Sequence, residues 1–186
     1  MYDPAMTVSV DKTRRLVTGI YSDSLGDPAN GGATCWFYFI ADFTKMSGTK
    51  VPVSIYNVGD GADANDMGEI LEILSPTKFT LTFKPDALPN GAARFGYEAG
   101  GRVSFSQSDA ATDKLWAGHA MRRVAAKKAT CFDEDGSAQR PFVVAHDAFV
   151  VVNERKDWVE GVYSRPASDA ETACWFKTTD LMPLPR

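Results

Sequence analysis

Hydrophobic and polar residues alternate over several segments of this chain with the two-residue period of a β-strand. In one such segment Phe79, Leu81 and Phe83 share one side, and Thr80 and Thr82 share the other. Turn-forming Gly, Pro, Asn and Asp residues separate the segments, as expected for a series of hairpins. The pattern predicts strands within residues 8–21 (a hairpin with its tip at 11–15), 34–43, 51–58, 69–83, 103–105 and 142–152.

Two segments, 35–40 and 142–152, are apolar on both strand faces. A sheet with one solvated face does not need this pattern. We therefore expect the second face to line a barrel interior or to be covered from outside. In the first segment Cys35, Phe37 and Phe39 share one face, whereas Trp36, Tyr38 and Ile40 share the other. We assign the Cys/Phe face to the core and the Trp/Tyr face to a cavity or a partner.

Residues 109–129 fit two kinds of element. Trp116, Ala120 and Val124 recur at helical spacing among good helix formers. The same stretch also resembles the repeated strand unit described next. We favour a strand for residues 114–121 and keep one short helix near 109–129 as the alternative.

The two ends of the chain repeat each other. Residues 8–22 align without a gap to residues 150–164, and the Cys-Trp-Phe sequence at 35–37 recurs at 174–176. The repeat predicts a closed or covered architecture with related three-strand units at its two ends. The expected units are residues 8–43 and 150–178, with a degraded third copy at about 103–132.

The chain has three cysteines, Cys35, Cys131 and Cys174, and an odd number does not suit a disulfide framework. Unpaired cysteine commonly packs as a small buried apolar residue. The repeat gives Cys35 and Cys174 equivalent places, so a bridge between these two is the alternative.

Composition indicates one globular domain, residues 1–186, with 44% hydrophobic and 24% charged residues. The net charge of −4 argues against a nucleic-acid partner, because phosphate binding needs an excess of Lys and Arg. No apolar run approaches the roughly 18–20 residues of a membrane-spanning helix, and no signal-peptide pattern is visible. We expect a soluble protein that is cytoplasmic by default, with a periplasmic or secreted mature form as the alternative.

Motifs that carry chemistry are scarce. The two histidines, His119 and His146, lack metal-ligand spacing, and no Gly-x-Ser-x-Gly sequence occurs. The acidic loop at 60–66 fails the calcium-loop pattern, since Met67 and Leu74 fall where oxygen ligands are required. We therefore expect no metal, no cofactor and no catalytic residues. An enzyme acting through His119 with a tyrosine or Glu160 is the least supported hypothesis.

The aromatic residues within the repeats are the best candidates for a binding site, because Trp and Tyr combine a large apolar body with a polar edge. We expect a non-catalytic protein that holds a small apolar or aromatic ligand in a β-barrel cavity. The alternative is a protein-interaction module, of the inhibitor or immunity type, that binds through loops 23–32, 59–66 and 85–101. The expected ligand-binding residues are Trp36, Tyr38, Trp116, His119, Trp158 and Trp175.

The Gly19-Ile20-Tyr21 and Trp116-Ala117-Gly118-His119 sequences resemble the style of calycin-type barrels, the lipocalin-like and avidin-like proteins. The Gly-x-Trp signature of lipocalins is absent, and the resemblance implies a style of fold without a function. Together with the strand pattern, it predicts an all-β chain. The expected fold is an antiparallel up-and-down barrel or curved meander of about eight to ten strands.

Overall fold

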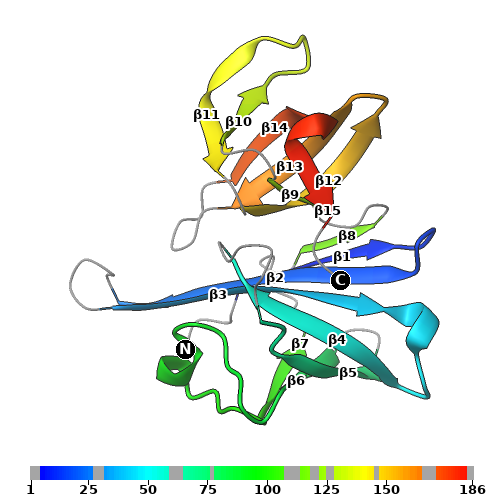
Figure 1. Ribbon diagram of the computed structural model, residues 1–186, viewed down its shortest axis with the longest axis vertical. Helices are drawn as coiled ribbons and strands as arrows, with labels where there is room; N and C mark the ends of the chain where they lie inside the picture. The colour runs from blue at the N-terminus through cyan, green and yellow to red at the C-terminus, as the bar shows by residue number, and fades with distance from the viewer. Residues whose placement is uncertain are drawn as a thin grey trace.

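The computed structural model describes residues 5–26, 32–58, 65–75, 78–106, 114–117, 122–124, 128–144, 147–164 and 171–183. The protein is all-β, as predicted, and its described strands form two sheets (Figure 1). The first sheet contains β1 (Ala5–Asp11), β2 (Leu16–Leu25), β3 (Ala33–Asp42), β4 (Lys50–Asn57), β5 (Gly68–Ser75), β6 (Lys78–Phe83), β7 (Arg102–Ser106) and β8 (Lys114–Ala117). The second contains β9 (Arg122–Val124), β10 (Lys128–Phe132), β11 (Ala138–Val144), β12 (Ala148–Arg155), β13 (Trp158–Ser164), β14 (Glu171–Lys177) and β15 (Leu181–Pro183).

These fifteen strands exceed the eight to ten that were expected. The main reason is the second sheet, which contains the three-residue strands β9 and β15 and in which the apolar run at 142–152 is divided between β11 and β12. Residues 114–117 form a strand, which agrees with the prediction for this part of the ambiguous segment. Within the described residues, no helix is both long and apolar enough to cross a bilayer.

The first sheet is a curved antiparallel meander from β1 to β7, extended at one edge by β8, which runs parallel to β1. Ring contacts across the sheet demonstrate the curvature. Tyr21 lies on β2 and Phe105 on β7, five strands apart in the sheet order, a span of about 24 Å in a flat sheet. Their ring centroids are nevertheless 5.7 Å apart. The sheet is therefore curled around its apolar face as a half-barrel.

Aromatic rings fill this apolar face of the half-barrel. Phe37 stacks on Tyr21 with 4.9 Å between ring centroids and meets the edge of Phe83 at 6.0 Å. Phe39 contacts Phe79 at 5.8 Å. We call this cluster the first core, and the prediction that the Cys/Phe face of β3 points into the core is confirmed.

The segment between β6 and β7, residues 84–101, returns across the half-barrel and contributes to the first core; we call it the strap. Its two ends are tied together by the Gly100 amide, which donates to the Lys84 carbonyl at 2.9 Å. Ala92, on the 3-10 helix Ala92–Phe95, is buried in the first core. Gly91 has a φ of +78° and lies against the Thr34 carbonyl, where a side chain would collide. The strap is thus fitted closely to the start of β3.

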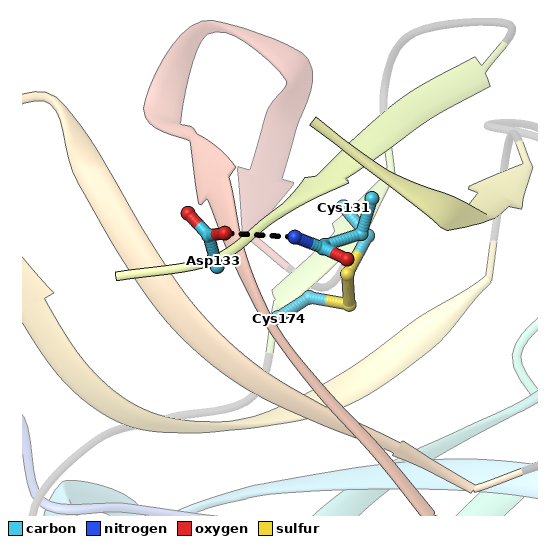
Figure 2. The surroundings of a disulfide bond; sticks show 4 residues. Cys131, Asp133 and Cys174 are labelled. Carbon is cyan, nitrogen blue, oxygen red and sulfur yellow. Dashed lines mark hydrogen bonds between the residues drawn. A yellow bond between two sulfur atoms is a disulfide. The ribbon is translucent and has the colours of Figure 1, made fainter. Parts of the chain in front are cut away.

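The second sheet encloses a core of its own, which we call the second core. It joins residues of β10, β11, β12, β13 and β14, with Phe149 and Phe176 in ring contact at 4.9 Å between centroids. The β10–β11 hairpin is attached to β14 through one backbone residue pair, Phe132 with Trp175. A disulfide between Cys131 and Cys174 reinforces this attachment (Figure 2).

The two sheets meet through the outer face of β3. Tyr38, which is fully buried, and Ile40 pack with Tyr56 of β4 and with Val150 of β12. Figure 1 shows the second sheet (yellow to red) lying over β2 and β3 of the first. The second apolar face of β3 is therefore covered from outside, which was one of the two expected arrangements.

The terminal repeat corresponds to β1–β2–β3 and β12–β13–β14. In each unit the repeated glycine of the middle strand leaves room for a phenylalanine ring. The Phe39 ring lies over Gly19, and the Phe149 ring lies over Gly161. The ring comes from β3, the strand after the glycine, in the first unit. In the second unit it comes from β12, the strand before the glycine. The strands at 103–132 are distributed over both sheets.

The expectation that Cys35 and Cys174 hold equivalent places is wrong. Cys35 pairs with Asp23 on β2, whereas Cys174 pairs with Gly161 on β13. Gly161 corresponds to Gly19, and Gly19 pairs with Phe39, four residues beyond Cys35. The matching Cys-Trp-Phe sequences therefore have different registers relative to the middle strand of their units.

The expectation that the cysteines do not form a disulfide is also corrected, and so is the alternative bridge. Cys35 lies in the first core and is a free thiol, whereas Cys131 and Cys174 are joined in the second core. Because the sheets stack through their outer faces, Cys35 and Cys174 belong to separate interiors. The Cα atoms of Cys131 and Cys174 are 5.1 Å apart, an ordinary separation for a disulfide.

Loss of the disulfide should destabilise the protein strongly. The bridge closes a loop with a sequence separation of 43 residues, for which the chain-entropy estimate is about 4 kcal/mol. We expect the double substitution Cys131→Ser and Cys174→Ser to lower the free energy of unfolding by about this amount, as measured by urea denaturation. Cys35→Ser is the control under the same conditions, because it replaces a cysteine that forms no disulfide. Equal stability of the double variant and the wild type would contradict the prediction.

Candidate functional site

The structure divides the predicted ligand-binding residues between two places. Trp36 and Tyr38 share the outer face of β3; Tyr38 is fully buried between the sheets and Trp36 is half-buried. Trp158 and Trp175 lie on β13 and β14 of the second sheet. None of these four residues belongs to the apolar cluster that fills the half-barrel.

Trp116 and His119 cannot be assigned to either place. Trp116 belongs to β8, where its backbone pairs with Ser9 of β1, but its side chain lies outside the described part of the structure. His119 falls entirely outside the described residues.

Trp158 and Trp175 form an aromatic group with Phe132 on the face of the second sheet opposite its core. Strand alternation explains this placement, because Cys131, Cys174 and Val159 point into the second core and their neighbours point away. The Phe132 and Trp158 rings meet edge to face, with centroids 5.0 Å apart and planes at 81°. Phe132 and Trp175 are cross-strand neighbours. Three adjacent strands therefore contribute to one aromatic group.

Two cationic side chains flank these rings. The Arg155 guanidinium lies 4.4 Å from the Trp175 ring centroid, and the Lys177 ammonium lies 5.7 Å from that of Phe132. Arg155 also donates to a Glu134 carboxylate oxygen at 2.8 Å. The cation covers much of Trp175, which is 7% exposed, whereas Trp158 and Phe132 are half-buried. We call Phe132, Trp158, Trp175, Arg155 and Lys177 the aromatic face.

Phe132, Arg155 and Lys177 were not among the expected site residues. A sequence signal for Phe132 does exist, because Cys131-Phe132 repeats the Cys-aromatic order of Cys174-Trp175. With the cysteine buried, strand alternation puts the following aromatic residue outside. Arg155 and Lys177 become recognisable only through the register, in which both are cross-strand neighbours of Trp158.

A polar cluster lies inside the half-barrel, beneath the strap. The Tyr21 hydroxyl donates to Asp23 Oδ2 at 3.2 Å, and the hydroxyls of Tyr21 and Tyr97 are 2.8 Å apart. Because the single Tyr21 proton is directed to the carboxylate, Tyr97 donates to Tyr21. Cys35 is buried beside this chain of hydrogen bonds, as the cross-strand neighbour of Asp23.

Burial governs the acid–base behaviour of this cluster. Desolvation raises the pKa of the Cys35 thiol to about 12, and the negative charge of Asp23 adds to the effect. Desolvation likewise raises the pKa of Tyr21 and that of Tyr97 above the usual range. Protonated, desolvated groups of this kind are weak nucleophiles and weak acids. The Tyr21–Tyr97 hydrogen bond joins the strap to β2.

Acidic residues near the predicted loops have structural roles in the hydrogen bonding. Asp66 Oδ1 accepts from the backbone amides of Ile55 and Gly68, each at 2.9 Å. Asp133, shown beside the disulfide in Figure 2, accepts from the Ser137 amide and from the Gln139 side chain, each at 2.8 Å. In the described residues, no cluster of three or more His, Cys, Asp or Glu side chains could hold a metal ion.

Comparison with known proteins adds no relative from which a function could be carried over. No protein-family model matches the chain, no curated protein matches it, and no solved structure matches it.

The polar cluster should make the protein sensitive to alkali. Cys35 and both tyrosines keep their protons in the folded state at pH values where the unfolded chain releases them, so stability falls as pH rises. We expect the free energy of unfolding to decline above about pH 8.5, the ordinary pKa of cysteine. Cys35→Ala should delay the decline toward about pH 10, where unfolded tyrosine ionises.

Urea denaturation between neutral pH and the alkaline range measures this dependence. At neutral pH the Cys35 thiol is protonated in both the folded and the unfolded state. Neither the wild type nor the variant should therefore lose stability with rising pH in that range. A decline that starts at the same pH in both proteins would contradict the assignment to Cys35.

Proposed function

We propose that this protein is a non-catalytic protein-interaction module that binds its partner through the aromatic face of the second sheet. The observation that carries the proposal is the position of Phe132 and Trp158. Large rings on strands usually lie in the core, yet these two lie outside it and are partly accessible. Trp and Arg side chains are enriched among the residues that dominate binding energy at protein interfaces.

The interior of the half-barrel supports this choice over a ligand cavity. Described aromatic side chains of β2, β3, β6 and β7 contact one another there, and the strap adds further apolar groups. The proposed contact surface also differs from the loops that were expected to bind a partner. The strap, residues 84–101, is committed to the first core through Ala92 and Tyr97, so the aromatic face replaces it as the proposed contact surface.

A small planar ligand is the second candidate for the same surface. The edge-to-face geometry of Phe132 and Trp158 leaves part of the Trp158 ring exposed, and an aromatic molecule can stack on such a ring. This keeps the expected chemistry of the ligand and moves its site from a cavity to the sheet surface.

Removal of Trp158 tests both candidates. We expect Trp158→Ala to weaken the partner complex by about 30-fold, the effect of an interface residue worth about 2 kcal/mol. The partner is first captured with the wild-type protein from extracts of the source organism, and its dissociation constant is then measured with purified components. Leu25→Ala is the matched control, because Leu25 is exposed on the first sheet, far along the chain from the aromatic face.

Thermal denaturation must accompany this measurement, since the variant also loses the Phe132 ring contact. Unchanged partner affinity in a folded Trp158→Ala variant would contradict the proposal. Tryptophan fluorescence against a panel of aromatic ligands separates the two candidates, because only a small-ligand site responds without the partner.

We further propose that the protein works in an oxidising compartment, as a periplasmic or secreted form. Disulfides are rare in reducing cytosol, and the Cys131–Cys174 bridge supports the hairpin that supplies Phe132. Alkylation during rapid lysis of cells in denaturant, which exposes the buried Cys35 thiol, should label one cysteine of the three in mass spectrometry. Labelling of all three in the native compartment would exclude this location.

A further inference from the structure

The connections at one end of the first sheet form a strongly basic surface. In an antiparallel meander, the turns that follow β1, β3 and β5 lie at the same end of the sheet. Hydrogen bonds join these turns, from the Phe43 amide to the Arg15 carbonyl and from the Ile73 amide to the Thr49 carbonyl, each at 2.9 Å. Figure 1 shows the turns after β1 and β3 at the right-hand end of the sheet. The exposed cations of these connections are Lys12, Arg14, Arg15, Lys45, Lys50 and Lys78, which we call the basic rim.

In the described part of the chain, the acidic residues beside the basic rim are already engaged. Asp11 is buried and lies 3.8 Å from Arg14, and Asp42 lies 3.8 Å from Lys45. Glu72 pairs with Arg102, which belongs to β7 and not to the rim. Among the described residues, six cations against three paired acids give this end a positive balance, although the whole chain has a net charge of −4.

Exposed apolar side chains protrude within the basic rim. Among the described residues, three large hydrophobic side chains are exposed, and two of them, Met46 (41%) and Leu74 (49%), are on the rim. A hydrogen bond joins their segments, because the amide of Ile73, the neighbour of Leu74, donates to the carbonyl of Thr49, three residues after Met46. The third, Leu25, ends β2 at the opposite end of the sheet.

We propose that the basic rim docks on an anionic phospholipid membrane surface, with Met46 and Leu74 inserted between the headgroups. Basic side chains around protruding apolar side chains match the two attractions of such a surface, electrostatic and hydrophobic. A protein partner fits less well, because four of the six cations are lysine, a residue depleted in protein interfaces. A nucleic acid also fits less well, because the exposed rim residues of the described chain include no aromatic ring for base stacking, and Phe43 in the same turn is half-buried.

Vesicle co-sedimentation tests this proposal with the full chain. We expect binding to mixed phosphatidylcholine and phosphatidylserine vesicles, no binding to pure phosphatidylcholine, and weaker binding as salt is raised. Since each lysine near an anionic bilayer contributes about fivefold, the triple substitution Lys45→Gln, Lys50→Gln, Lys78→Gln should weaken binding by about a hundredfold. The matched control removes the same charge away from the rim, as Arg94→Gln, Lys128→Gln, Lys156→Gln, and should retain binding.

The apolar contribution is tested separately. We expect Met46→Ser with Leu74→Ser to weaken vesicle binding by about tenfold, and Leu25→Ser, at the opposite end of the sheet, to leave it unchanged. All these positions are exposed, so the variants should fold, which circular dichroism and thermal denaturation verify.

Several results would overturn the membrane assignment. These are equal binding to neutral vesicles, equal loss in the control variant with charges removed away from the rim, or vesicle binding that is insensitive to Met46→Ser with Leu74→Ser. Displacement from the vesicles by inorganic phosphate at an equal phosphate concentration would make the rim a phosphate site. Tight rim-dependent binding to soluble polyglutamate or to heparin, without vesicle binding, would assign it to an acidic protein or to a soluble polyanion.

Discussion

The burial of β3 on both faces is the constraint on which the rest of this structure depends. Phe37 and Phe39 lie in the first core, while Tyr38 and Ile40 lie beneath the second sheet. Full burial of one such side chain stabilises a fold by about 1.5–3 kcal/mol. A slip of one residue in the register of β3 would exchange the faces and place a tyrosine hydroxyl among the phenylalanines of the first core. The register, the curl of the first sheet and the stacking of the second are therefore fixed together.

The position of β12 follows from this constraint and determines where the aromatic face begins. Val150 and Val152 pack on the outer face of the first sheet, whereas Val151 points into the second core. The pairing with β13 shifts register between Val151 and Asn153, and beyond this irregularity Asn153 and Arg155 are exposed. The first half of β12 thus covers β3. Its second half does not pack on the first sheet, and the neighbouring surface at Trp158 stays uncovered.

Much of the fold could be predicted from the sequence, because strand alternation is a local property. The first hairpin, the strands β3 to β6 and the Cys/Phe face of β3 all follow from the two-residue period. What could not be predicted is what covers each second face, because periodicity carries no information about the neighbouring element. The matched Cys-Trp-Phe sequences show this limit, since their register against the middle strand differs by four residues.

The two candidate surfaces also differ in how far the sequence could predict them. Trp158 and Trp175 could be selected from the sequence because aromatic residues stand out individually, and only their location outside a cavity required the structure. The basic rim had no comparable signal. Its cations come from turns separated by about thirty residues each, and no single turn is unusual in a chain with a net charge of −4. Only the meander topology, which returns every second turn to the same end, brings them together. The rim belongs to the first sheet and the aromatic face to the second. Both proposed binding surfaces therefore lie outside the two cores that the described residues form.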